Sequence, residues 1–153
     1  STNLYAMNGA KEMLHDVLYL SVQNLAGGAL PVPISSLSWD YNTGVNQSVP
    51  ELEQFKINWR PNTKRVIIIF TDERGQTYTD PEITQDILIQ ALTASPELKV
   101  YAFSTPWYKE NGGITWGWEP LCTATSGSWY ELTSDMLTMY NNLMEIIDEN
   151  ACE

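Results

Sequence analysis

The sequence predicts an α/β domain of the doubly wound type: a mostly parallel sheet with helices on both faces, in three layers. Two apolar runs, Arg65–Thr71 and Leu98–Ser104, have the length and composition of strands, and the first is β-branched and flanked by charge. A segment with the three- and four-residue spacing of a helix separates them, and another follows a third short apolar run, Trp129–Leu132. Strands alternating with helices in this way form right-handed βαβ units with parallel strands.

The first part of the chain is less regular. A helix is expected from Asn3 to about Leu20, where apolar residues recur every three or four positions. Glycine and proline then punctuate the chain as far as Thr63, with one short helical turn expected around Val49–Phe55. A connection of this length is unusual inside a compact domain, so an insertion is expected at about residues 26–60 of a single domain spanning residues 1–153.

In the second part of the chain, the expected strands and helices alternate more clearly. After the first strand, Asp80-Pro81-Glu82 is expected to open a helix that runs to about Thr93. The second strand leads into a loop rich in glycine and tryptophan, residues 105–120. Thr133 or Ser134 is expected to cap the last helix. The apolar residues expected along that helix are Leu137, Tyr140, Leu143, Met144 and Ile147.

The composition narrows the classes of function. Eight Lys and Arg residues stand against 19 Asp and Glu residues, a formal net charge of −11. Such a field repels phosphate backbones, so no binding to nucleic acid is expected. The longest clean apolar run, Val66–Phe70, is far shorter than the ~20 residues of a membrane-spanning helix, so no span is expected. The amino terminus resembles no signal peptide, and the missing initiator Met suggests removal of something upstream.

Two cysteines, Cys122 and Cys152, leave one possible pairing within the chain. A disulfide closing a loop of about thirty residues is the preferred interpretation, with a stabilisation of ~3 kcal/mol on the chain-entropy model. It predicts an extracellular or cell-surface location, because disulfides persist in oxidising compartments. The alternative is a pair of buried free thiols in a cytosolic protein.

Acidic residues follow the first strand at the edge where parallel sheets bind ligands. The apolar run leads directly into Thr71, Asp72 and Glu73. A hard cation such as Mg²⁺ takes oxygen ligands and keeps several waters, so one carboxylate with hydroxyls from neighbouring loops suffices. The alternative is that Asp72 only caps the following turn or pairs with Arg74.

The stretch from Trp59 to Glu73, which ends in Arg-Val-Ile-Ile-Ile-Phe-Thr-Asp-Glu, resembles the fourth-strand signature of von Willebrand factor A domains. Three further segments are similar to that family. Lys99–Ser104 matches its next strand, Thr125–Leu132 its threonine-glycine-glycine stretch before the last helix, and Ser1–Ala10 its glycine-threonine-asparagine segment. The resemblance covers the larger part of the chain.

The resemblance implies a metal-ion-dependent adhesion site. Carried over, Thr2 and Asp72 become the metal-binding threonine and aspartate, which hold Mg²⁺, Mn²⁺ or Ca²⁺ while an acidic group of the ligand completes the shell. Glu73, next to Asp72 in the sequence, is expected to contact the ligand. The family's Asp-x-Ser-x-Ser element is absent, since the nearest candidate, Asp40–Gly44, lacks both serines. We therefore expect an upstream segment of the same domain to supply the remaining strands, because three strands alone leave a long apolar edge exposed.

The loop of residues 105–120 is expected at the same edge of the sheet. Its aromatic residues, placed among glycines, are Trp107, Tyr108, Trp116 and Trp118. Exposed aromatic side chains make a contact surface at low entropic cost, and a flat ring also stacks on sugars. The alternative is a loop folded back on itself, with its indoles covering the end of the sheet.

These observations predict an extracellular adhesion or ligand-binding module that holds an acidic protein or glycan ligand through a divalent metal. It is not expected to be an enzyme. A structural or assembly domain with a degenerate metal site, binding through the aromatic loop, is the first alternative. A hydrolase is the second, using the acids between Glu73 and Asp86 or Ser1 as an amino-terminal nucleophile. The single histidine, His15, is not visibly paired with a nucleophile.

Overall fold

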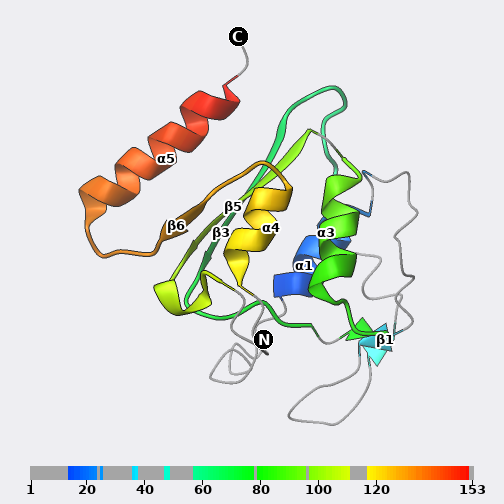
Figure 1. Ribbon diagram of the computed structural model, residues 1–153. Coiled ribbons are helices and arrows are strands. Elements are labelled where there is room, and N and C mark those ends of the chain that lie inside the picture. Colours follow the sequence, from blue (N-terminus) through cyan, green and yellow to red (C-terminus); the bar gives the residue numbers. More distant parts are fainter. Residues whose placement is uncertain are drawn as a thin grey trace, which may run out of the picture. The chain divides into compact units, whose positions relative to one another are not determined.

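The computed structural model describes residues 14–23, 25, 36–37, 47–48, 57–77, 79–95, 97–110 and 117–151. Within these ranges the chain is an α/β protein with a three-stranded parallel sheet flanked by helices (Figure 1). It divides into two compact units, residues 1–59 with 75–95 and residues 60–74 with 96–153, called here the first and the second unit. In the described part of the chain, no helix combines the length and the apolar character that a membrane crossing requires.

The parallel sheet forms the framework of the second unit. β3 (Arg65–Thr71) pairs with β5 (Leu98–Ser104), and β5 pairs with β6 (Trp129–Glu131). The register places Thr71 opposite Ser104, so both long strands end at the same edge. The predicted bounds of the two long strands and their parallel direction are therefore confirmed, and the third strand is one residue shorter than predicted.

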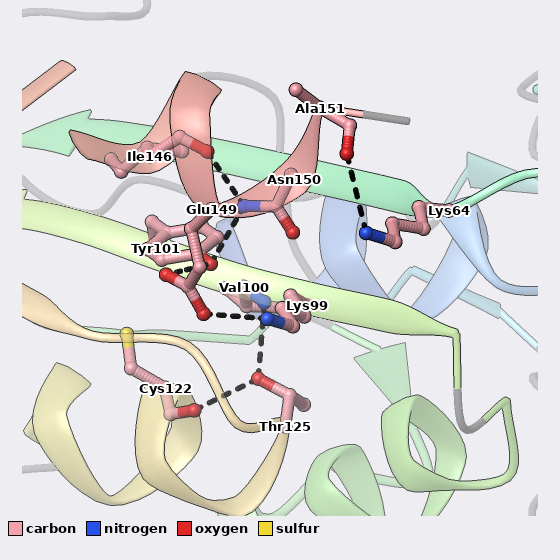
Figure 2. A network of polar contacts seen from close by, with 10 residues as sticks. All are labelled: Lys64, Lys99, Val100, Tyr101, Cys122, Thr125, Ile146, Glu149, Asn150 and Ala151. Atoms are coloured by element: carbon pink, nitrogen blue, oxygen red, sulfur yellow. Dashed lines mark hydrogen bonds and ion pairs between the residues drawn. The ribbon is translucent and has the colours of Figure 1, made fainter. Parts of the chain in front are cut away.

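One helix covers each face of this sheet. α4 (Trp118–Ala124) and α5 (Met136–Asn150) lie on opposite sides of β5, as Figures 1 and 2 both show. Burial beneath α5 removes large apolar side chains from water, at about 1.5–3 kcal/mol for each one fully buried. The cluster consists of Tyr101, Phe103 and Ile146, with Val66, Tyr130, Leu132, Met139 and Leu143 packed against it.

The short helix α4 was not predicted, because its residues were assigned to the aromatic loop and the connection after it. Glycine and tryptophan dominate the preceding sequence and hide a helix of only seven residues. Pro120 lies in its first turn, where a missing backbone N–H leaves no helical hydrogen bond unmade. Because a helix tolerates proline in its first turn, α4 can form in a segment whose sequence otherwise resembles a loop.

The connection from α4 to β6 is a close-packed turn. Ser126 has φ 59°, in the left-handed region that favours glycine, and the backbone N–H of Gly127 donates to the carbonyl of Cys122 over 2.9 Å. A Cβ atom on Gly127 would collide with the carbonyl oxygen of Val100. Glycine is therefore required at position 127, because the turn lies directly against the backbone of β5.

The cap of the last helix lies one residue after Ser134 and two after Thr133, the two caps predicted. Asp135 is the N-cap, and its carboxylate accepts a hydrogen bond from the backbone N–H of Leu137 over 3.2 Å. Thr133 instead accepts from the N–H of Asp135 over 3.1 Å. The Thr138 hydroxyl also donates to the Asp135 carboxylate and is the main cause that lowers the pKa of Asp135, and the N–H of Leu137 adds to this shift. The aspartate is favoured here since a carboxylate satisfies the free N–H groups of the first turn.

The first unit contains α1 (Leu14–Ser21) packed against α3 (Gln85–Thr93). The start predicted for the first helix, Asn3, lies outside the described residues. The start predicted for α3 was wrong: Thr84 is its N-cap, with a hydroxyl that accepts from the N–H of Ile87, and Thr79–Asp80 forms the short strand β4. The acids at Asp80 and Glu82 therefore precede the helix.

A small antiparallel sheet completes the description of the first unit. β1 (Ser36–Leu37) pairs with β2 (Gln47–Ser48) on one side and with β4 on the other. Most of the predicted insertion at residues 26–60 and the predicted turn at Val49–Phe55 lie outside the described residues.

Polar groups are buried in the first unit beside α1. His15 is 1% exposed, and burial lowers its pKa to about 4, although a hydrogen bond with the backbone of Ile83 opposes this shift. A Cβ atom on Gly75 would collide with the imidazole ring. Asp16, also buried, accepts a hydrogen bond from the hydroxyl of Thr77. The histidine is therefore a buried core residue that is neutral at pH 7.

Candidate functional site

Asp72 lies immediately after β3, at the carboxyl edge of the parallel sheet, and its side chain is exposed. Within the described part of the chain, no hydrogen bond or ion pair holds its carboxylate. The pairing with Arg74, one of the alternatives to a metal ligand, is therefore not formed among the described residues. An exposed carboxylate at the end of an apolar strand leaves both oxygen atoms accessible to a cation or a ligand.

The backbone around Asp72 is held in place even though its side chain is not. The hydroxyl of Thr71 accepts a hydrogen bond from the N–H of Glu73 over 2.9 Å, which closes a tight local turn. The indole N–H of Trp118, on α4, donates to the carbonyl of Glu73 over 2.9 Å. These two bonds fix the residue that follows Asp72, so its carboxylate is presented from a braced loop.

The end of β5 lies at the same edge and is also braced by an indole. Trp129 donates from Nε1 to the hydroxyl of Ser104 over 2.7 Å, and the N–H of Leu132 donates to the carbonyl of Ser104 over 2.8 Å. These contacts were not predicted. Trp129 and Ser104 are separated by 25 positions, and only the register of β5 with β6 brings them together.

A positively charged side chain, that of Lys109, also lies at this edge. The Lys109 ammonium lies 5.2 Å from the ring centroid of Trp129 and 3.5 Å from a carboxylate oxygen of Glu119. Because both partners of this ion pair are more than a third exposed, solvent limits its contribution to about 1 kcal/mol or less. The backbone N–H of Glu119 donates to the carbonyl of Lys109 over 2.9 Å, so these two positions of the aromatic loop lie against each other.

The aromatic residues predicted for ligand contact differ in how far their side chains are exposed. Trp107, in the 3₁₀ turn η2 (Pro106–Tyr108), is 81% exposed, as predicted for a contact residue. Tyr108 is half-buried. Trp118 is 1% exposed, which corrects its prediction as a ligand contact: its ring is packed inside and its N–H serves Glu73. Trp116 lies outside the described residues.

The described residues include one candidate metal ligand and no complete metal site. No group of three or more His, Cys, Asp or Glu side chains in the described ranges is arranged to hold a metal ion. Asp72 supplies one free carboxylate, with Glu73 next to it, whereas Thr2 lies outside the described residues. A Mg²⁺ ion retains several waters and takes one or two carboxylates, so Asp72 suits a first ligand and the shell requires others from elsewhere.

The predicted disulfide involves one described residue. Cys122, on α4, is a free thiol that is fully buried, and burial raises its pKa to about 12. Cys152 lies outside the described residues. In Figure 2, Cys122 lies on the α4 side of β5, and Ala151 lies on the α5 side. The pairing therefore stays a prediction.

A second polar network lies at the opposite end of the sheet (Figure 2). Glu149, near the end of α5, accepts hydrogen bonds from Lys99 over 2.6 Å and from the Tyr101 hydroxyl over 2.9 Å. Asn150 donates to the same hydroxyl over 2.8 Å. The hydrogen bond from Lys99 is the main cause that lowers the pKa of Glu149. The network attaches α5 to the start of β5 and has a structural role.

Comparison with known proteins gives no relative: no protein-family model, no curated protein and no solved structure matches the chain.

Proposed function

We propose that the chain belongs to an extracellular adhesion module of the von Willebrand factor A type. In this proposal, an acidic group of a protein or glycan ligand binds through Mg²⁺, Mn²⁺ or Ca²⁺ at the carboxyl edge of the β3-β5-β6 sheet. The observation that carries the proposal is the exposed carboxylate of Asp72, on a loop braced by Thr71 and Trp118.

The position of Asp72 agrees with the general location of ligand sites in parallel sheets. Side chains at the carboxyl ends of the strands face the crevice where such proteins bind their ligands. The net charge of −11 raises the local concentration of cations around the chain. Both features support a cation site, and neither supplies a nucleophile paired with a base, so the proposed role is binding without turnover.

Each participant has a defined part in this proposal. Asp72 provides the first protein ligand, and Thr2 provides a hydroxyl, as the sequence resemblance implies. A bound divalent ion would supply a Lewis-acidic position for an oxygen of the acidic ligand. Glu73 adds negative charge beside the ion, which strengthens cation binding. The remaining protein ligands would come from an upstream segment of the same domain.

Trp107 favours a second candidate function. Its side chain is 81% exposed on a 3₁₀ turn at the same edge, and large exposed aromatic side chains commonly anchor protein contacts. A structural or assembly domain with a degenerate metal site could bind a partner through Trp107 alone. The two candidates differ in one measurable property, because only the first requires a metal ion.

Calorimetric titration of Mg²⁺ and Mn²⁺ into the full protein that contains this chain tests the proposal. We expect saturable binding that falls by at least about tenfold in the Asp72→Ala variant, the smaller end of the loss caused even by outer-shell changes. Asp148→Ala is the matched control, because Asp148 is an exposed acid near the far end of α5. Binding that is absent, or that is unchanged in Asp72→Ala, contradicts the metal site and leaves the second candidate.

A further inference from the structure

Lys109 adds a positive charge beside the residues of the candidate site, at the carboxyl edge of the sheet. Two hydrogen bonds connect its backbone with the loop that carries Asp72. The carbonyl of Lys109 accepts from the N–H of Glu119 over 2.9 Å, and the indole of Trp118, the residue before, donates to the carbonyl of Glu73 over 2.9 Å. Lys109 and Asp72 therefore belong to one continuous set of contacts within the second unit.

The ammonium of Lys109 is held in position but is not fully paired. It lies 5.2 Å from the ring centroid of Trp129, an indole that is itself fixed by a hydrogen bond to Ser104. A carboxylate oxygen of Glu119 lies 3.5 Å away, farther than the roughly 2.7–2.9 Å of a charge-assisted hydrogen bond. Because an ammonium has several N–H donors and this side chain is 38% exposed, Lys109 can bind an acceptor from outside the chain.

Two other ion pairs among the described residues are tighter. Lys99 donates to Glu149 over 2.6 Å, and Arg65 donates to Glu97 over 2.9 Å, both as hydrogen bonds. The ion pair of Lys109 is the longest of the three that the described residues form. It is therefore the ion pair in which a carboxylate from outside the chain can most easily join or replace the partner.

An exposed indole lies two positions before Lys109 in the chain. Trp107 is 81% exposed on η2, and the N–H of Lys109 donates to the carbonyl of Pro106 over 3.3 Å, which closes this turn. Trp107 lies three positions after the end of β5, and Asp72 lies one position after the end of β3. Because the two strands end in register, the indole, the ammonium and the carboxylate are attached close to neighbouring strand ends.

The charged groups around Trp107 favour a sugar over a protein surface as its contact. Protein interfaces bury ~800 Å² on each partner, and their aromatic anchors lie in patches from which water is excluded. Here the exposed side chains of Asp72 and Glu110 and the ammonium of Lys109 bring charge to the same edge. A sugar ring suits this mixture, because its C–H face stacks on a flat indole while its hydroxyl groups bond to charged side chains.

The position of Lys109 further favours a sugar that carries a carboxylate. The formal net charge of −11 opposes an anionic ligand at long range. Salt at physiological strength screens exposed charges beyond ~8 Å, so the local charge decides once the ligand is close. At that range the ammonium of Lys109 attracts a carboxylate, and a neutral sugar gains nothing from this attraction.

We infer that Trp107 and Lys109 form a recognition site for an acidic saccharide. The indole of Trp107 stacks on a pyranose ring, and the ammonium of Lys109 binds the carboxylate of the saccharide and determines the preference for an acidic sugar. This inference rests on the proposed function for the ligand-binding role of this edge, and it deepens that function by naming the class of ligand. A divalent ion at Asp72 would add to the attraction of the carboxylate, but the contacts of Trp107 and Lys109 require no metal.

The experiment titrates the protein with two matched sugars, methyl glucuronide and methyl glucoside, which differ in the carboxylate. NMR signals of the tryptophan indole N–H groups report binding, and the signal that is missing in Trp107→Phe identifies Trp107. With EDTA present, we expect the glucuronide to bind at least about tenfold more tightly than the glucoside, the size of effect expected for a hydrogen bond between charged groups. The signal of Trp107 should shift with both sugars.

Three variants assign the contacts. Lys109→Met keeps most of the side-chain length and should abolish the preference for the glucuronide, whereas Lys109→Arg keeps the charge and should retain the preference. Trp107→Ala should weaken the binding of the glucuronide at least about tenfold, as loss of an aromatic anchor does at other binding sites. Lys64→Met is the matched control, because Lys64 is an exposed lysine that contacts Ala151 at the opposite end of the sheet.

The results separate this inference from the metal site. Equal affinities for the two sugars, a preference that survives in Lys109→Met, or binding that is unaffected by Trp107→Ala overturns the inference. A capped aspartate peptide that shifts the Trp107 signal where the glucuronide does not also overturns it and identifies a protein ligand. Metal binding without sugar binding leaves the proposed metal site standing, and a preference for the glucuronide in EDTA supports the inference even if no metal binds.

Discussion

The indole Nε1 of Trp118 donates a hydrogen bond to the backbone carbonyl of Glu73 over 2.9 Å, across 45 positions of sequence. This bond joins α4 to the loop after β3, where Asp72 presents its carboxylate. Trp118 is therefore a positioning residue for the candidate site. Trp107, which belongs to the same aromatic-rich segment, is exposed instead.

Replacing Trp118 with phenylalanine removes the donor and part of a buried ring. We expect a loss of about 1–3 kcal/mol in the free energy of unfolding, because the carbonyl of Glu73 loses its partner in a part-buried position. Circular dichroism during thermal unfolding measures the change. Trp107→Phe is the matched control and should remain within about 0.5 kcal/mol of the wild type. Equal losses in both variants would show that the hydrogen bond from Trp118 to Glu73 makes no measurable contribution to the free energy of unfolding.

The turn between α4 and β6 predicts opposite effects at neighbouring positions. Gly127→Ala places a methyl group against the carbonyl of Val100, and we expect destabilisation of about 1–3 kcal/mol or more. Ser126→Gly relieves a residue with φ 59°, and we expect a gain of up to about 1 kcal/mol. Chemical denaturation of both variants measures the two changes. A stable Gly127→Ala variant would contradict the close approach of the turn to β5.

His15 predicts a dependence of stability on pH. Its pKa is about 4 in the folded chain, below its ordinary value of 6.5, so the unfolded chain binds the proton more tightly. The contribution of His15 to the free energy of unfolding is therefore fully present above pH 6.5. As the pH falls from 6.5 toward 4, this free energy decreases by about 3 kcal/mol in total. As the chain has a single histidine, NMR titration of one imidazole reads the pKa directly. A midpoint near 6.5 would contradict burial of His15.

Cys122 provides a test of the predicted cellular location. Its buried thiol, with a pKa of about 12, should resist alkylation at pH 8 until the chain is unfolded. If the disulfide with Cys152 forms in solution, the unreduced chain should instead be lighter than the reduced chain by the mass of two hydrogen atoms. Intact-mass spectrometry before and after reduction decides between these outcomes. Equal masses would remove the main argument for an extracellular location.

Local patterns predicted β3 and β5 well, because each is a short apolar run whose character is evident from neighbouring residues. The same approach misplaced the start of α3, where Pro81 and two acids resemble a helical first turn but Thr84 provides the cap. It also missed α4, which is short and contains Pro120. The type of an element was thus predictable where its apolar pattern extended over many residues. The position of a helix start was harder to predict, because a single hydrogen bond from the capping side chain decides it.

The environment of individual side chains was harder to predict. The sequence shows that Leu137, Tyr140 and Ile147 are apolar members of the last helix, but all three are exposed. The apolar residues of this helix form one broad arc, and only the tertiary contact with β5 decides which of them are covered, as Leu143 and Ile146 are. The bond between Trp118 and Glu73 was likewise unpredictable, since no local pattern relates residues so far apart.

The proposed metal site requires that Thr2 and Asp72 bind the same ion. Adding Mn²⁺ to the isotopically labelled full protein tests this directly, because a paramagnetic ion broadens the amide signals of nearby residues. The account predicts that the signals of Thr2 and Asp72 disappear together at the lowest Mn²⁺ concentrations, while that of Asp148 persists. Broadening at Asp72 without broadening at Thr2, or at neither residue, would contradict a shared site.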